Sequence, residues 1–139
     1  MTPSFLSWVL NFADKKETKL DRVFRLTSSD EHSNPLDLIK ANSWWQEQGI
    51  SKDYPVIFFV GTFMSVFDFK PVQHAAKKFA KQGIKCQFVL CGAGDYLDEI
   101  KVMMEGLTNV FFPGWIDKPE IESLAKISIA SLAPYKNID

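Results

Sequence analysis

Apolar runs alternate with amphipathic stretches along most of the chain. Four short apolar runs, bounded by glycine, proline or polar residues, predict strands at 56–60, 85–91, 109–112 and 127–132. Helical spacing of apolar residues between them predicts helices at 71–82, 97–105 and 117–125. The unbroken run at 56–60 is typical of a strand buried on both faces, and strands alternating with helices form βαβ units. We therefore expect an α/β fold with a Rossmann-like parallel sheet flanked by helices.

A further helix is expected before the first strand. Asn34 is a favoured N-cap residue, Pro35 suits the first helical position and Gly49 is a typical stop, which predicts a helix over 35–48. The side chains expected to face inward are Leu36, Ile39 and Trp45. The preceding chain is expected to form an extended segment and then a polar loop, at 20–26 and 27–34.

The N-terminal apolar stretch does not have the pattern of a secretion signal, because charged residues follow it in place of a small-residue cleavage site. Phe5, Trp8 and Phe12 recur at helical spacing and predict a short amphipathic helix. Packing on protein and contact with a membrane surface are both open for this helix: nearby basic residues favour a membrane, and interspersed acids favour protein. The basic residues are Lys15, Lys16, Lys19, Arg22 and Arg25, and the acids are Asp14, Glu17 and Asp21.

Composition excludes several classes of protein. The 139 residues, 46% of them hydrophobic, suffice for one ordinary domain with a real core. Sixteen Lys and Arg against 17 Asp and Glu give a formal charge of −1, which argues against a nucleic-acid-binding protein because such proteins need a basic surface. No apolar run approaches the roughly 18 residues that span a bilayer, which excludes an integral membrane protein.

The two cysteines are expected to be free and buried. Cys86 and Cys91 lie five residues apart in a predicted strand, which places them on opposite faces and about 16 Å apart, beyond disulfide reach. Neither belongs to a CxxC motif or lies near a histidine pair, so we expect no metal site. Free thiols fit a cytosolic protein.

Three loops are candidates for chemistry, because ligands of open parallel sheets bind at the carboxyl ends of the strands. The loops are 61–65, 92–95 and 113–117. Glycines beside a helix start expose N–H groups that favour an anion such as phosphate, although the same glycines could serve only tight turns. A dinucleotide fingerprint is disfavoured, because the sequence GAGDYL has Leu97 in the place of the third glycine and follows the second strand.

The isolated polar residues suggest no separate catalytic set. His32 is expected in a solvated polar loop, and His74 is expected on the surface of a helix, with no carboxylate or cysteine partner in register. Asp95 and Asp117 are expected to cap helices, and Glu120 lies three residues after Asp117 as in a capping box. No Ser-His-Asp or Cys-His set can be nominated with these two histidines.

Five short motifs follow one another at regular spacing. They are Phe59-Val60-Gly61, Ala75-Ala76, Cys91-Gly92-Ala93-Gly94, Asn109-Val110-Phe111-Phe112-Pro113-Gly114 and Ala133-Pro134-Tyr135. In this order they resemble the donor-binding half of retaining glycosyltransferases of family 4 (group 1), which have the two-domain GT-B fold. The earlier motif Asp21-Arg22-Val23-Phe24 and the stretch from Trp44-Trp45 to Gly49-Ile50 resemble the interdomain stretch of that family.

The resemblance implies transfer of a sugar from a nucleotide-sugar donor to a glycan or lipid-linked acceptor, with no metal or other cofactor. It places the diphosphate near Gly61 and Thr62, and the base near Trp115 and Ile116. The complete set of implied donor-binding residues is Gly61, Thr62, Phe63, Gly92, Gly94, Trp115 and Ile116. It also implies a cytoplasmic enzyme, or one peripheral on the inner membrane surface.

The chain departs from the family pattern at the positions that bind the diphosphate. Many members carry an Arg and a Lys that neutralise the phosphates, and the matching positions here hold Thr62 and Phe67. Lys70 is nearby but off register. The acidic motif that contacts the donor sugar in this family would follow Asp139. We therefore expect a fragment of a GT-B C-terminal domain that does not catalyse transfer alone.

This interpretation divides the chain into three parts. Residues 1–19 would be the terminal helix left from an N-terminal acceptor domain, 20–54 an interdomain linker and helix, and 55–139 a partial nucleotide-sugar-binding domain. An open sheet edge would favour self-association of such a fragment. Two alternatives stay open: a non-catalytic α/β interaction module, which would have no nucleotide affinity, and a GT-B nucleotide-sugar epimerase, which would convert its donor without an acceptor.

Overall fold

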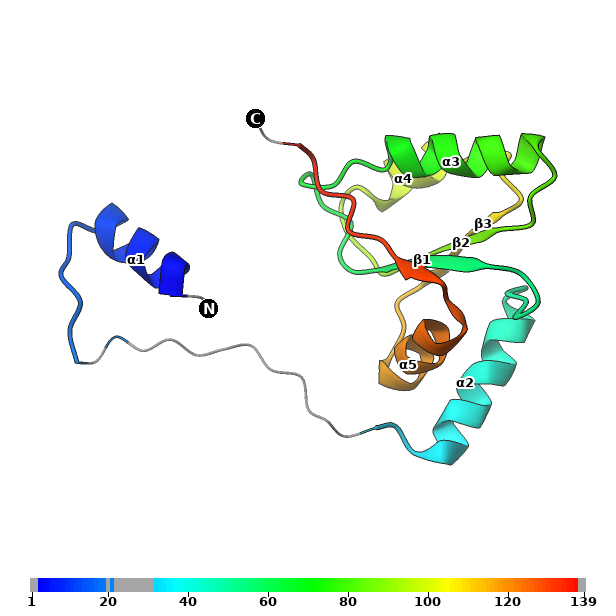
Figure 1. Cartoon of the computed structure of the whole chain (residues 1–139), viewed down its shortest axis with the longest axis horizontal. Helices are drawn as coiled ribbons and strands as arrows, with labels where there is room; N and C mark the ends of the chain where they lie inside the picture. The colour runs from blue at the N-terminus through cyan, green and yellow to red at the C-terminus, as the bar shows by residue number, and fades with distance from the viewer. Residues whose placement is uncertain (1–2, 20, 22–31, 138–139) are drawn as a thin grey trace. The chain divides into compact units, whose positions relative to one another are not determined.

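The computed structural model describes residues 3–19, 21 and 32–137, which fall into two compact units divided after His32. The larger unit has the predicted α/β architecture (Figure 1). Apart from Asp21, the extended segment predicted at 20–26 lies outside the described residues, as does most of the loop predicted at 27–34.

A four-stranded parallel sheet forms the centre of the larger unit, with the strand order β3-β2-β1-β4 (Figure 1). The strands are β1 (Val56–Val60), β2 (Gln87–Cys91), β3 (Val110–Gly114) and β4 (Ala130–Ser131). All four predicted strands are therefore confirmed. The last is shorter than expected because Ile127 still belongs to the preceding helix. The chain runs outward from β1 through β2 to β3 and then returns to place β4 on the other side of β1.

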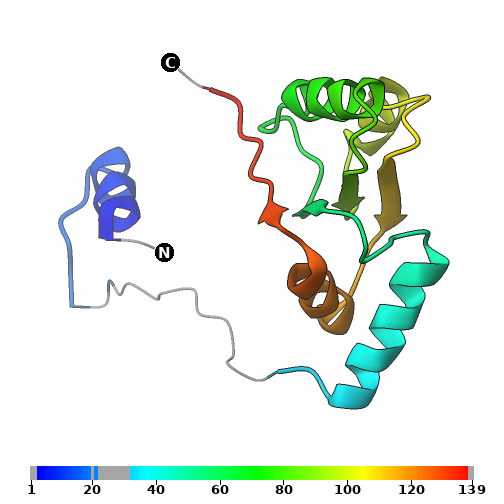
Figure 2. The same ribbon diagram turned by 45° about the vertical axis from the view of Figure 1, so that its right-hand side comes forward.

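Helices cover both faces of the sheet (Figure 1; Figure 2). One face carries α3 (Lys70–Lys81) and α4 (Leu97–Met103), and the other carries α2 (Pro35–Glu47) and α5 (Lys118–Ile127). Each of these helices lies close to its predicted boundaries. The two helical layers bury the sheet from both sides, which explains the nearly continuous apolar runs in β1 and β2.

The sheet separates two apolar cores. Cys86 belongs to the core beneath α3 and α4, whereas Cys91 belongs to the core beneath α2 and α5, so the predicted opposite orientation of the two free thiols is confirmed. Burial raises the pKa of the Cys91 thiol to about 12, so this group stays protonated and is no nucleophile at neutral pH. Val60, at the carboxyl end of β1, departs from the predicted burial and is 36% exposed.

The inward face of α2 differs from the prediction. Asn34 caps the helix as expected, and its side chain accepts a hydrogen bond from the Leu36 N–H at 2.9 Å. Leu36 and Ile39 are 66% and 61% exposed, so the prediction that they face inward is wrong, whereas Trp45 is buried. The helix docks through the face that carries Ala41 and Trp45, and the Trp45 Nε1–H donates to the Glu120 carbonyl at 3.1 Å.

The two predicted aspartate caps have different outcomes. Asp117 is the N-cap residue of α5, although its side chain makes no capping hydrogen bond. Tyr96 is the N-cap residue of α4, so the prediction that Asp95 caps this helix is wrong. The N-cap therefore lies one residue later than expected. The Tyr96 N–H donates to the Phe63 carbonyl at 3.3 Å and so connects the start of α4 to the loop after β1.

The smaller unit contains the predicted N-terminal helix, α1 (Pro3–Phe12). Phe5, Trp8 and Phe12 follow one another along the helix with adjacent ring centroids 5.6 Å apart, and all three side chains are exposed. Their placement confirms the amphipathic pattern. Within the described ranges, no helix combines the length and the apolar character needed to cross a membrane.

Candidate functional site

The direction of the sheet topology reverses at β1, which has β2 on one side and β4 on the other. Ligands of open α/β sheets bind in the crevice outside the carboxyl ends of the strands at such a point. The loop after β1, at 61–69, is therefore the centre of the candidate site. The loop after β2, at 92–96, and the segment after β4, at 132–137, border it.

Backbone hydrogen bonds join the loops after β1 and β2 beyond the ends of their strands. The Gly61 N–H donates to the Cys91 carbonyl at 3.1 Å, and the Phe63 N–H donates to the Ala93 carbonyl at 2.9 Å. In the same way the Gly92 N–H donates to a β3 carbonyl at 2.7 Å. These three N–H groups, which a glycine-rich phosphate loop would offer to its anion, are engaged within the protein.

Two glycines permit this close approach of the loops. Gly92 has a φ of +130°, and a Cβ there would lie 1.9 Å from the Gly61 carbonyl oxygen. Gly94 has a φ of +151°, and a Cβ there would lie 2.3 Å from the Phe63 carbonyl oxygen. No real Cβ tolerates such distances, so both positions require glycine for backbone packing alone.

The predicted donor-binding residues differ in what they offer a ligand. Phe63 and Ile116 are buried, and their side chains belong to the two apolar cores. Thr62 is exposed in the loop after β1, and Trp115 is 73% exposed just beyond β3. Among the predicted side chains, Thr62 and Trp115 are thus the ones within reach of a ligand.

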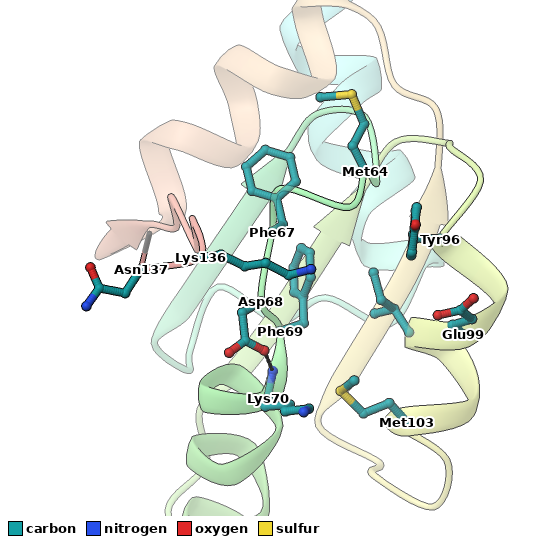
Figure 3. Close-up of a pocket in the computed structure, with 11 residues that line it drawn as sticks. Met64, Phe67, Asp68, Phe69, Lys70, Tyr96, Glu99, Met103, Lys136 and Asn137 are labelled. Carbon is teal, nitrogen blue, oxygen red and sulfur yellow. Dashed lines mark hydrogen bonds between the residues drawn. The ribbon is translucent and has the colours of Figure 1, made fainter. Parts of the chain in front are cut away.

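A pocket of about 460 Å³ opens between the loop after β1, one face of α4 and the segment after β4 (Figure 3). Apolar side chains form its buried floor, and charged and polar side chains surround it. The lining residues are Met64, Phe67, Asp68, Phe69, Lys70, Tyr96, Glu99, Ile100, Met103, Lys136 and Asn137. None of the seven predicted donor-binding residues lines this pocket.

A cluster of phenylalanine rings supports the floor of the pocket. The Phe59 ring lies 5.1 Å from Phe69, 5.2 Å from Phe63 and 5.3 Å from Phe67, measured between centroids. The pairs with Phe67 and Phe69 are edge-to-face, a geometry that fixes ring orientations more closely than aliphatic contacts do. The loop after β1 is therefore anchored to the core by its own aromatic side chains.

The segment after β4 is fastened to the loop after β1 in antiparallel fashion. The Asp68 N–H donates to the Pro134 carbonyl at 2.7 Å, and the Lys136 N–H donates to the Val66 carbonyl at 2.9 Å. Between these two bonds, the rings of Phe67 and Tyr135 lie 4.9 Å apart. The two segments flank the point of topological reversal, so this attachment brings Lys136 to the pocket.

Two ammonium groups and two carboxylates line the pocket. Asp68 Oδ1 accepts a hydrogen bond from the Lys70 N–H at 3.0 Å and so holds the first turn of α3. Lys136 reaches over the pocket from the segment after β4, and Glu99 lies across it on α4 (Figure 3). Lysines in such a place can bind phosphate oxygens as mobile point charges. Within the described residues, no three His, Cys, Asp or Glu side chains gather as a metal site would require.

The sequence pattern of the family described as Glycosyl transferases group 1 matches residues 41–137. The chain belongs to this family. The matched region contains the complete sheet and the lining of the pocket. The predicted resemblance to glycosyltransferases is thereby confirmed.

Solved structures with the same fold include a larger glycosyltransferase. This group 1 chain is similar to the crystal structure of the glycosyl transferase family 9 from Veillonella parvula, with a TM-score of 0.53 and 13% sequence identity. The similarity covers 73% of this chain and 30% of that chain, so the group 1 chain spans less than a third of the length of the other protein. At this identity the likeness concerns the fold alone. No curated protein matches the sequence.

Proposed function

We propose that this group 1 glycosyltransferase chain binds a nucleotide-sugar donor, as part of a longer enzyme that transfers the sugar with retention at the anomeric carbon. The observation that carries the proposal is the pocket at the point of topological reversal, lined by two lysines from separate segments. A donor of this class carries a diphosphate, and paired cations stabilise that charge.

Lys70 and Lys136 would take the place of the Arg and Lys that the family resemblance implies. The corresponding positions, Thr62 and Phe67, hold no charge. The N–H groups of Gly61 and Gly92 donate within the protein and are not available to the phosphates. Side-chain cations are therefore the groups on which the diphosphate depends in this proposal.

Trp115 would hold the nucleoside. Its indole is 73% exposed just beyond β3, and stacking on an indole face stabilises any nucleobase. The neighbouring Ile116 is buried and anchors the loop that carries the tryptophan. The Thr62 hydroxyl, exposed after β1, would donate to a phosphate or ribose oxygen.

The proposal assigns binding to this chain and transfer to the longer enzyme. The catalytic residues and the site for the glycan or lipid-linked acceptor would lie outside residues 1–139. The reaction is proposed to need no metal, because lysines supply the positive charge at the diphosphate. A cytoplasmic location, where nucleotide sugars are available, is part of the same proposal.

Isothermal titration of the chain with a panel of UDP-, GDP- and other nucleotide sugars tests this proposal. We expect the variant Lys70→Met/Lys136→Met to bind its donor on the order of 100-fold more weakly, because two charge-assisted contacts are lost. The corresponding nucleosides, which lack phosphate, should bind both proteins alike.

The matched control is Lys52→Met/Lys126→Met, which removes the same charge from lysines that do not line the pocket. Circular dichroism confirms that each variant is folded. A wild-type chain that binds no nucleotide sugar contradicts the proposed function. Equal losses in both double variants contradict the assignment of the phosphates to Lys70 and Lys136.

A further inference from the structure

The ionisable side chains on the exposed side of α3 are all basic. The helix has the sequence KPVQHAAKKFAK and contains no acidic residue. Its buried side chains Val72 and Ala76 face the core. The exposed basic side chains that follow the pocket lysine Lys70 along the helix are His74, Lys77, Lys78 and Lys81, defined here as the α3 basic face.

These charges lack neutralising partners. In the described part of the chain, no carboxylate lies within ion-pair distance of Lys77, Lys78 or Lys81, whereas Lys40 pairs with Asp37 and Lys126 pairs with Glu122. Such a concentration of charge is notable in a chain whose formal net charge is −1.

Helix stability explains only part of this arrangement. Lys78 and Lys81 lie in the last turn of α3, where the helix dipole favours cations. Lys77 lies one turn before Lys81, and like charges at this spacing repel. The repulsion between Lys77 and Lys81 would be relieved by an external anion.

We propose that the α3 basic face docks on an anionic lipid bilayer. Anionic headgroups attract surface lysines over distances of about a Debye length, and the attraction needs a local patch rather than a basic protein. The apolar side of α3 is buried in the core, so the helix cannot insert. The contact is therefore electrostatic, reversible and weakened by salt.

The chemistry of the face favours a bilayer over nucleic acid or an acidic protein. Its fixed charges are all lysines, which attract diffuse negative charge, whereas the planar arginine side chain is suited to bidentate recognition of single groups. Phe79 packs against the core, so the His74 imidazole is the one exposed ring of α3, and a single ring cannot provide the row of stacking platforms that single-stranded nucleic acid uses. A shallow groove of about 430 Å³ between these basic groups and Gln82 can seat a headgroup phosphate.

Co-sedimentation of the chain with lipid vesicles tests the proposal. The probes are phosphatidylcholine vesicles with and without phosphatidylglycerol, at low and high salt. We expect binding to the anionic vesicles only. The variant Lys77→Gln/Lys78→Gln/Lys81→Gln should lower the partition coefficient on the order of 100-fold, at about fivefold for each lysine.

The control Lys40→Gln/Lys52→Gln/Lys126→Gln removes the same charge from α2, the turn after it and α5. It should bind vesicles within a few-fold of wild type. The proposal is overturned if the wild type does not bind anionic vesicles, or if the two triple variants lose binding equally. It is also overturned if the α3 variant binds vesicles like the wild type, because another part of the chain, such as α1, would then hold the membrane. Tighter binding to single-stranded oligonucleotide than to vesicles also overturns it. Titration with nucleotide sugars measures binding at the pocket, so its result does not depend on whether the chain binds vesicles.

Discussion

The glycine-rich edge after β1 and β2 and the pocket between the loop after β1, α4 and the segment after β4 lie at the same end of the sheet but are built differently. At the glycine-rich edge, the N–H groups of Gly61, Phe63 and Gly92 donate to neighbouring strands and loops. At the pocket, the Lys70 and Lys136 side chains line a cavity of about 460 Å³. One region is closed by its own backbone, and the other presents side chains to solvent.

Glycine after a parallel strand can therefore have either of two roles. It allows an anion to approach a bare backbone, or it allows a second backbone to approach. In this chain, the distance from an added Cβ at Gly92 to the Gly61 carbonyl oxygen decides for the second role. In the proposed function, the phosphates are then bound by side chains that the sheet topology brings together.

The largest effect is expected from Gly92→Ala. The added methyl would lie 1.9 Å from the Gly61 carbonyl oxygen at a φ of +130°, so the loops must separate. We expect a loss of about 3 kcal/mol or more in the free energy of unfolding, from strain and overlap together. Urea denaturation followed by circular dichroism measures this loss.

Gly106→Ala is the matched control for the first prediction. Gly106 also has a positive φ, +79°, but a Cβ there meets nothing within 4 Å. Strain alone should cost about 1 kcal/mol. If the two variants are equally stable, the glycine-rich edge is not closed by backbone packing. The N–H groups of that edge would then be candidate ligands for the phosphates.

A smaller effect, on binding alone, is expected from Trp115→Ala. The side chain is exposed, so its removal should leave the unfolding free energy nearly unchanged. Loss of base stacking should weaken the affinity for the nucleotide sugar about tenfold. Calorimetric titration with the nucleotide and with inorganic diphosphate separates the contributions, because the diphosphate alone should bind both proteins equally. A tenfold loss for diphosphate as well would place Trp115 at the phosphates instead of the base.

Local patterns in the sequence were sufficient to predict the strands and helices of the larger unit. The runs before Gly61 and Gly92 and the cap at Asn34 depend on neighbours in the chain, and all three predictions are confirmed. The inward face of α2 could not be predicted, because it depends on where α5 meets the helix. Leu36 and Ile39 lie about 180° and about 120° around the helix from Trp45, on the side turned away from α5.

The pocket could not be predicted for a related reason. Its lysines are separated by most of the domain, and they meet only because β4 pairs with β1 and the following segment bonds to residues 66–68. Lys70 was visible in the sequence as a cation near the expected diphosphate, but Lys136 follows a strand of two residues and carries no local signal. Strand order, which a single sequence does not specify, decides which loops share a site.

The smallest effects are expected from two substitutions of Asp68, which belongs to both the fold and the pocket. Its Oδ1 accepts from the Lys70 N–H at 3.0 Å, and its carboxylate adds negative charge beside the proposed diphosphate. Asp68→Ala should cost about 1 kcal/mol of unfolding free energy through the lost acceptor, whereas Asp68→Asn keeps an acceptor and should cost less. Both should strengthen nucleotide-sugar binding roughly threefold, because each removes one partly exposed charge.

Asp117→Ala is the control for stability, because Asp117 starts a helix without a capping hydrogen bond and should cost less than Asp68→Ala. Urea denaturation and donor titration of the three variants separate the two roles of Asp68. Tighter donor binding with unchanged stability in Asp68→Asn would mean that the pocket is limited by its own carboxylates. Weaker binding in that variant would mean that Asp68 contacts the donor directly, and the lysines would then not act alone.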